Sequence, residues 1–193
     1  SNMSQPLGEY AGLRCEIIEA IDCLKGNTHN ELVELSIELC TKILLQSGVC
    51  KNKSEARIQL LQNIENGSAL KKFEDMILAQ NGDLKHLYSK NRIARNVLIV
   101  KSRKKGFIKS IDTEKIGWAL VEMGCGRKVS SDHLDFKAGM KFNYKIGDLI
   151  YKDDPICELF CSDKIKIENA SKIIEKSFLI DEHEVKKPKL ILN

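Results

Sequence analysis

The fold is decided by two neighbouring stretches, GFIKSIDTEKIGWALVEMGCGRK (residues 106–128) and DFKAGMKFNYKIGDLIYKDDPICELFC (residues 135–161). In the second stretch, apolar residues recur at every other position, at Met140, Phe142, Tyr144 and Ile146. This period of two is typical of a strand with one buried face. The dipeptide Gly147-Asp148 comes next and favours a tight turn. We therefore expect a strand that ends in a β-hairpin at Gly147.

The first stretch contains the signals of a short helix. Asp112 is a good N-cap residue for a helix from Thr113 to Met123, whose Ile116 and Leu120 share one face. Gly124 suits the left-handed conformation that commonly follows the last helical turn. The two stretches together predict a small module of strand, helix and strand.

Helical signals dominate the region before this module. The predicted helices run over residues 14–24, 30–47 and 52–65, and from Ser68 towards Asn81-Gly82, where we expect the helical region to end. Capping boxes are indicated at Thr28 to Glu31 and at Asn52 to Glu55. In the first helix we expect Ile17 on the buried side. The helix over 30–47 has apolar residues on more than one stripe, so we expect protein around most of it.

The period changes to two after this region, which predicts an α+β fold. We expect a strand over residues 97–100, a helix capped by Ser162-Asp163, and closing strands over 178–180 and 190–192. The predicted domains are a helical segment, residues 3–90, and a small C-terminal domain, residues 91–193, with the boundary near Lys90. Met140-Lys141 superficially resembles the hairpin of lipoyl or biotin carriers, but the turn at Gly147 follows too soon. The likeness indicates a barrel-sandwich-like architecture without that cofactor.

Composition narrows the class of protein. The chain has 193 residues, 42% of them hydrophobic, and a formal net charge of +4. Its seven cysteines are odd in number and form no C-x-x-C motif, and no apolar run is long enough to cross a bilayer. We expect a cytoplasmic protein with free thiols that binds neither membrane nor nucleic acid. Ser1-Asn2 ahead of Met3 is interpreted as an expression scar, and the irregular opening around Pro6 as an internal start.

Few residues carry a chemical signal of their own. The four histidines, His29, His86, His133 and His183, are scattered along the sequence and are interpreted as surface residues. The basic run from Lys101 to Lys105 is interpreted as a solvated turn. No cysteine can be nominated as a nucleophile.

The run Gly124-Cys125-Gly126-Arg127 has two interpretations. Consecutive backbone N–H groups could form a concavity for an anion, with Arg127 as a charged fork. The run follows the C-terminal end of a helix, however, where the helix dipole disfavours an anion. We favour a plain helix stop followed by an adaptable loop.

Six short motifs, in order along the chain, resemble those in the C-terminal portion of the pyrimidine nucleoside phosphorylases, the thymidine phosphorylase family. They are Met3 to Gly8 (compare D-M-x-Q-P-L-G), Glu16 to Ile21 (E-V-x-E-A-I), Ala79 to Asp83 (A-A-Q-G-G-D), Gly106 to Ile108 (G-Y-V), Met123 to Arg127 (L-G-A-G-R) and Lys145 to Asp148 (K-x-G-D). The chain departs from the family's G-N-A-L-E-V at Gly12 to Ile17, which leaves the preferred base open. The resemblance implies that the helical segment is the end of a larger α/β domain.

The resemblance also implies an activity, that of a pentosyltransferase of nucleoside salvage. Inorganic phosphate, as co-substrate, would attack C1′ of a pyrimidine nucleoside and release the base. The family's phosphate and base sites, including K-x-S-x-G-G, precede the Q-P-L-G motif, so no catalytic or substrate-binding residue transfers to this chain. We therefore expect a truncated chain that is inactive alone, from an enzyme that forms homodimers.

Two smaller sites follow from the resemblance. A lid loop is assigned to Gly124, Gly126 and Arg127, within residues 124–141. A structural potassium ion would take backbone carbonyls at Leu7 and Tyr10 and the carboxylate of Glu19, and no other cofactor is expected. Two alternatives stay open: a scaffold or interaction domain that kept the fold without the chemistry, and part of an AMP phosphorylase.

Overall fold

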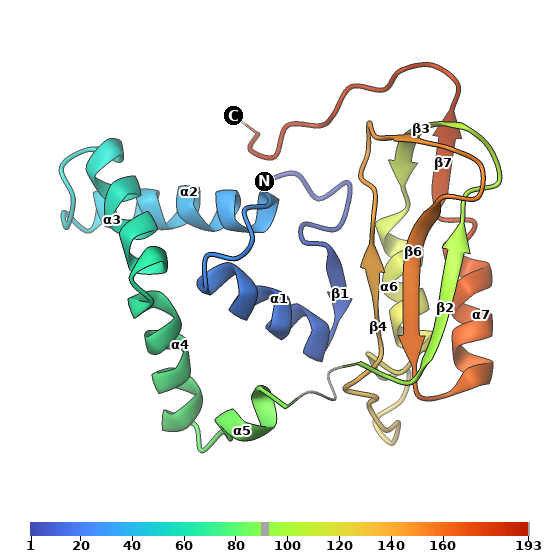
Figure 1. Cartoon of the computed structure of the whole chain (residues 1–193), viewed down its shortest axis with the longest axis horizontal. Coiled ribbons are helices and arrows are strands. Elements are labelled where there is room, and N and C mark those ends of the chain that lie inside the picture. The colour runs from blue at the N-terminus through green and yellow to red at the C-terminus, as the bar shows by residue number, and fades with distance from the viewer. Residues whose placement is uncertain (90–92, 193) are drawn as a thin grey trace. The chain divides into compact units, whose positions relative to one another are not determined.

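The computed structural model describes residues 1–89 and 93–192, and it has the predicted α+β fold (Figure 1). The helices are α1 (Arg14–Leu24), α2 (Glu31–Gln46), α3 (Lys53–Glu65), α4 (Ser68–Ala79), α5 (Leu84–Leu87), α6 (Thr113–Glu122) and α7 (Lys164–Ile174). The strands are β1 (Tyr10–Gly12), β2 (Asn96–Lys101), β3 (Gly106–Ile111), β4 (Gly139–Phe142), β5 (Leu149–Ile150), β6 (Pro155–Cys161) and β7 (Phe178–Asp181). The boundary predicted near Lys90 lies outside the described residues.

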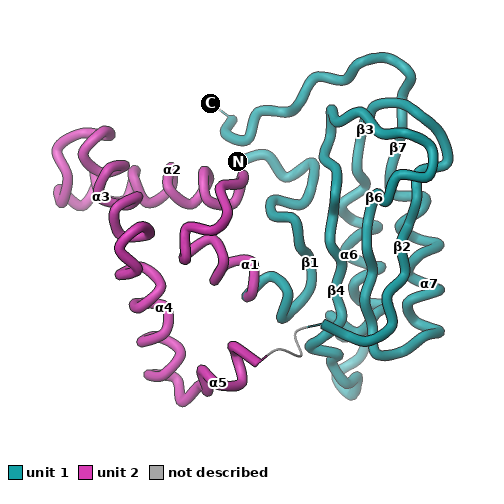
Figure 2. Tube along the Cα trace, in the orientation of Figure 1, with its two compact units in different colours: residues 1–17, 91–193 teal, residues 18–90 magenta. Residues whose placement is uncertain are grey.

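The chain forms two compact units (Figure 2). Unit 1 comprises residues 1–17 and 91–193, and unit 2 comprises residues 18–90. The N-terminal segment with β1 thus belongs to the same unit as the other strands, although these strands are far from β1 in the sequence. The division into domains of residues 3–90 and 91–193 stays a prediction.

Unit 1 is built on two antiparallel sheets. The first has the strand order β1-β4-β6-β2 and the second the order β5-β3-β7, and no closed barrel forms among the described residues. Helices α6 and α7 pack side by side against one face of the four-stranded sheet (Figure 1). One continuous cluster of buried side chains joins both sheets and both helices, including Ile108 of β3, Met140 of β4, Leu159 of β6 and Ile174 of α7.

The hairpin expected at Gly147 is wrong. Gly147 does adopt a left-handed turn conformation, with φ of 90°. The strands on its two sides lie in different sheets, because β4 pairs with β1 and β6 whereas β5 pairs with β3. The alternating pattern did identify the buried face, since Met140, Phe142 and Ile146 are all buried. Alternation determines which side chains face the core and leaves the neighbouring strand open.

The helix of this module matches its prediction. Asp112 caps α6 by accepting a hydrogen bond from the Lys115 N–H at 3.0 Å, and Gly124 follows the helix with φ of 92°. Ile116 and Met123 are buried in the core of unit 1. Local capping signals therefore sufficed to place both ends of α6.

The two capping boxes of unit 2 have different outcomes. The predicted box at Thr28 is wrong, because Asn30 caps α2, its Oδ1 accepting from the N–H groups of Leu32 (3.1 Å) and Val33 (3.3 Å). At α3 the prediction is confirmed at the cap, where Asn52 Oδ1 accepts from the Glu55 N–H at 2.9 Å. The Glu55 carboxylate accepts from the Lys51 N–H, one residue earlier than a standard box.

Four further expectations need correction. Helix α2 is not surrounded by protein, because its Leu39 and Ile43 are 51% and 61% exposed. In α1, Ile17 is not buried either, since it is 42% exposed. The helical region continues past Gly82 with the short α5. Residues 190–192 form no strand, and the backbone hydrogen bond there joins the Asn2 N–H to the Leu190 carbonyl at 2.8 Å.

Candidate functional site

The loop that joins α6 to β4 begins with the glycine-rich run. The Gly124 N–H donates to the Val121 carbonyl at 3.0 Å, and the Cys125 N–H donates to the Leu120 carbonyl at 2.9 Å. Both N–H groups thus complete the last turn of α6 and are unavailable to an anion. This geometry is that of a plain helix stop. The loop returns to its start, since the Asp135 N–H donates to the Gly124 carbonyl at 2.9 Å.

Asp132 organises the exposed part of this loop. Its Oδ2 accepts from the N–H groups of Lys128 (2.9 Å) and Val129 (3.2 Å), and these two hydrogen bonds lower the pKa of the carboxyl. Arg127 is exposed, and its Nε donates to the Asp132 carbonyl at 3.2 Å. A Cβ on Gly126 would lie 2.9 Å from Val121 Cγ2, so a larger residue would push the loop away from α6. The predicted lid residues Gly124, Gly126 and Arg127 are therefore part of a loop that has internal hydrogen bonds of its own.

Asp135 connects this loop to the start of α7. One carboxylate oxygen accepts from the Ser162 N–H at 2.8 Å, and the other accepts from the Lys137 N–H at 3.0 Å. Burial acts to raise the pKa of Asp135, but these hydrogen bonds outweigh it and hold the pKa below its usual value. Sequence reasoning did not single out Asp135, because a lone aspartate in a polar loop carries no motif.

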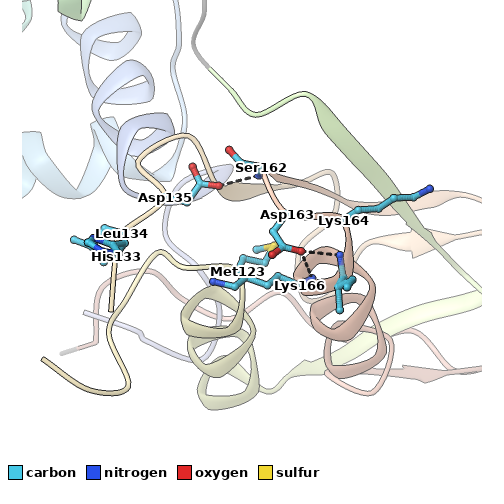
Figure 3. Close-up of a pocket in the computed structure, with 9 residues that line it drawn as sticks. Met123, His133, Leu134, Asp135, Ser162, Asp163, Lys164 and Lys166 are labelled. Carbon is cyan, nitrogen blue, oxygen red and sulfur yellow. Dashed lines mark hydrogen bonds between the residues drawn. The ribbon is translucent and has the colours of Figure 1, made fainter. Parts of the chain in front are cut away.

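A surface hollow of about 660 Å³ lies between the loop and α7 (Figure 3). It is lined by Met123, His133 to Asp135 and Ser162 to Lys166. The first N–H groups of α7 are already satisfied, because Asp163 Oδ1 accepts from Ile165 (2.8 Å) and Lys166 (3.1 Å). The lining brings carboxylates and lysines together but contains no paired nucleophile and base.

The thiols are free and the four histidines are exposed, as the sequence suggested. All seven cysteines are free, and five are buried: Cys15, Cys23, Cys50, Cys157 and Cys161. Burial raises the pKa of the Cys125 thiol to about 12, and it also raises the pKa of Cys157 and Cys161, so these thiols stay protonated. Across residues 1–89 and 93–192, no three His, Cys, Asp or Glu side chains are grouped to hold a metal ion. No helix in those ranges is long and apolar enough to span a membrane.

The Q-P-L-G segment meets the K-x-G-D motif in unit 1. The Lys145 ammonium group donates to the carbonyls of Pro6, Leu7 (3.4 Å) and Gly8 (2.6 Å). In addition, Gln5 Oε1 accepts from the Ile146 N–H at 2.8 Å. Both motifs are visible in the sequence, but their contact is not, since Leu7 and Lys145 stand 138 residues apart.

The residues predicted to bind potassium have different surroundings. The Leu7 carbonyl faces the Lys145 ammonium group, and Tyr10 lies in β1 with its ring 5.8 Å from the Lys141 ammonium group. Glu19 is buried, and its carboxylate accepts from Asn30 Nδ2 at 3.1 Å. Leu7 and Tyr10 belong to unit 1 and Glu19 to unit 2, so neither unit gathers the three oxygens by itself. The potassium site stays a prediction.

Comparison with known proteins shows sequence similarity to one family over part of the chain and to several of its members over nearly all of it. Residues 107–181 match the family described as the pyrimidine nucleoside phosphorylase C-terminal domain. The chain is 32% identical over 195 residues, 99% of its length, to a pyrimidine-nucleoside phosphorylase of Bacillus subtilis (strain 168). It is also 32% identical over 187 residues, 96% of its length, to that of Staphylococcus aureus (strain bovine RF122 / ET3-1). The chain spans less than half of these relatives, 44% and 43% of their lengths.

Proposed function

We propose that this chain supplies the C-terminal domain of a pyrimidine-nucleoside phosphorylase and the helices that precede that domain. The proposal starts from the similarity of the chain to the C-terminal part of such enzymes. One observation carries the proposal: the similarity extends over 96–99% of the chain, whereas the matched domain family covers only residues 107–181. Unit 2 is therefore included in the similarity. A domain that had been recruited alone into an unrelated protein would not bring the preceding helices with it.

The proposed reaction of the whole enzyme is phosphorolysis. An oxygen of inorganic phosphate attacks C1′ of the nucleoside, the bond from C1′ to the base nitrogen breaks, and the base leaves with the electron pair and takes up a proton. The products are a free pyrimidine and a sugar 1-phosphate. This chemistry needs N–H or cationic groups around the phosphate and hydrogen-bond donors at the departing base.

Apart from Arg127, whose role in a lid is proposed below, this chain contributes none of those groups in our proposal. The N–H groups at the two most suggestive places, the end of α6 and the start of α7, are satisfied by the protein itself. The buried thiols stay protonated, and the hollow beside α7 has no nucleophile paired with a base. We infer that the phosphate and base sites lie in the part of the enzyme outside this chain, and that the chain alone does not turn over substrate.

The loop after α6 is our candidate for a lid over the active-site cleft of the whole enzyme. Its ends are fixed by Asp135 and its tip is organised by Asp132, while Arg127 stays exposed. A loop with fixed ends and an exposed cation can meet an anionic substrate without unfolding. In full-length enzyme, Arg127→Ala should raise the KM for phosphate or lower kcat, and Lys152→Ala, in an exposed turn of the same unit, should change neither. Unchanged kinetics in Arg127→Ala would exclude the lid role.

The proposed activity is tested with the full-length protein and inorganic phosphate. Thymidine, uridine, cytidine and AMP are supplied one at a time, and the sugar phosphate is detected by ³¹P NMR. We expect product from thymidine or uridine and none when phosphate is omitted. Product from AMP alone would favour an AMP phosphorylase, and no product from any substrate would favour a scaffold domain. The homodimer, a cytoplasmic location and a potassium ion belong to the same proposal for the whole enzyme and are not needed for this test.

A further inference from the structure

The tip of the loop after α6, residues 127–132, is closed by its last residue, Asp132. Asp132 Oδ2 accepts from the N–H groups of Lys128 (2.9 Å) and Val129 (3.2 Å). The Asp132 N–H in turn donates to the Val129 carbonyl at 3.1 Å. An aspartate side chain that binds nearby backbone N–H groups stabilises a turn without a helix or a strand around it. The tip is therefore a closed turn with an internal support.

Arg127 is bound to this turn through one of its three side-chain nitrogens. Its Nε donates to the Asp132 carbonyl at 3.2 Å, and its two terminal nitrogens form no hydrogen bond or ion pair within residues 1–89 and 93–192. Because a guanidinium group is planar, the hydrogen bond at Nε fixes its plane and leaves the edge with both terminal nitrogens open. Two parallel donors on one edge are suited to bidentate binding of an oxyanion such as phosphate.

The backbone on both sides of Arg127 is attached to α6. On one side, a Cβ on Gly126 would lie 2.9 Å from Val121 Cγ2, so the backbone there lies close against the helix. On the other side, the Lys128 ammonium group forms an ion pair with Glu122 of α6, and this contact lowers the pKa of the Glu122 carboxyl. The position of the arginine backbone is thus set by α6, whereas the direction of its side chain is set by the turn.

We propose that Asp132 is a positioning residue for phosphorolysis, which holds the Arg127 guanidinium group in the orientation in which its open edge meets the oxyanion. The inference rests on the proposed function and on the lid role of Arg127 within it. Asp132 does not touch the phosphate itself, because its carboxylate would repel an anion and is directed to the N–H groups of Lys128 and Val129. Its effect on the reaction passes entirely through Arg127.

The first test is a double-mutant cycle on kcat/KM for phosphate in the full-length protein. Asp132→Ala removes the acceptor of two N–H groups and should lower kcat/KM by roughly 2–10-fold, because the loosened turn no longer orients Arg127. In an Arg127→Ala background the same substitution should cause no further loss, since no guanidinium group is left to orient. Asp132→Asn keeps an acceptor oxygen and should retain kcat/KM within about twofold. Glu182→Ala, at an exposed carboxylate of unit 1 outside the loop, is the control and should change nothing.

The second test does not depend on activity. In the 193-residue chain, ¹⁵N NMR follows the exchange with water of the Arg127 Nε–H and of the N–H groups of Lys128 and Val129. We expect all three to be protected in the original chain and in Asp132→Asn, and to exchange faster in Asp132→Ala. Protection in the chain combined with a full-length protein that has no turnover would refute the proposed function, while the hold of Asp132 on Arg127 would stand.

Three outcomes would overturn the proposal. Equal losses from Asp132→Ala with and without the Arg127 side chain would show that the substitution acts through general stability. A loss in Asp132→Asn as large as that in Asp132→Ala would show that the acceptor oxygen is not what matters. An unprotected Arg127 Nε–H in the original chain would show that the turn does not orient the arginine, and this last measurement decides the question if Asp132→Ala does not fold.

Discussion

Units 1 and 2 both contain well-capped helices, but the helices differ in how much of their apolar surface is buried. In unit 1 a single cluster of buried residues joins two sheets with α6 and α7, and Met140, Leu159 and Ile174 are fully buried within it. In unit 2 the buried cluster consists of Cys23, Val33 and Ile37. Helices α4 and α5 bury no residue fully. The comparison shows that a well-capped helix is not yet a well-buried one.

Exposed apolar side chains make the difference plain. Those of the helices of unit 2 include Leu39, Ile43, Ile58, Leu61, Met76 and Leu78. Isolated helices of this length are marginal in water, and most helical stability in proteins comes from packing of an apolar face. We therefore expect the amides of unit 2 to exchange with solvent through openings of lower free energy than those of unit 1.

The largest expected effect is a difference in stability between two leucine-to-alanine variants, one at a buried position and one at an exposed position. Leu159 of β6 is 0% exposed and Leu78 of α4 is 50% exposed. Leu159→Ala should destabilise unit 1 by about 2–5 kcal/mol because it removes buried surface and leaves a cavity. Leu78→Ala should change the stability of unit 2 by less than about 0.5 kcal/mol. Native-state hydrogen exchange measures each unit separately, and equal losses would break the comparison.

The second effect tests the loop of unit 1. Asp135→Ala removes acceptors from the N–H groups of Ser162 and Lys137 and should cost on the order of 1–3 kcal/mol. The folded pKa of Asp135 is lowered, so its contribution is present above the unfolded value of about 3.9 and is lost as pH falls through the folded pKa. The difference in stability between the two proteins should shrink as pH falls below about 4. A constant difference would show that the carboxylate charge is not involved.

A smaller effect is expected at a helix cap of unit 2. Asn52→Ala removes the acceptor of the Glu55 N–H and should destabilise α3 by about 1 kcal/mol. Lys53→Ala, at the next residue, is the control, since alanine is a good helix former and Lys53 is not the cap. Hydrogen exchange of the first turn of α3 follows both variants. Equal protection in the two would mean that the cap does not stabilise this helix.

The smallest effect is expected for a surface ion pair of unit 2. Lys71 Nζ lies 2.8 Å from Asp75 Oδ1, four residues on, with both side chains largely exposed. The hydrogen bond to Asp75 raises the pKa of Lys71, but solvent and salt screen such pairs. We expect Lys71→Ala to leave the stability of α4 unchanged in 0.5 M sodium chloride. A clear loss at that salt concentration would show that the pair contributes more than exposure suggests.

Local signals predicted the elements well and their partners poorly. Asp112, Asn52 and Asp163 were recognised as caps because the groups that satisfy them lie within the next three residues. Asn30 replaced Thr28 as the cap of α2, a choice between two suitable residues that sequence spacing alone does not decide. The hairpin at Gly147 failed because alternation carries no information about which strand is the neighbour.

The candidate sites were harder to predict than the elements, because their contacts join residues that are far apart in the sequence. The motifs containing Gln5 and Lys145 were both visible in the sequence, but their pairing arises only when β1 joins β4. The role of Asp135 depends on Ser162, which follows β6. The similarity to a family pointed to a reaction, whereas the contacts inside unit 1 had to come from the structure.

We have proposed that this chain is part of a pyrimidine-nucleoside phosphorylase and does not hold its reaction centre. The most direct test measures phosphate-dependent release of uracil or thymine by the full-length protein and by the purified 193-residue chain at equal molar concentration. The account predicts turnover by the full-length protein and none by the 193-residue chain. Turnover by the chain, free of host enzyme, would contradict it, and so would a full-length protein that releases no base.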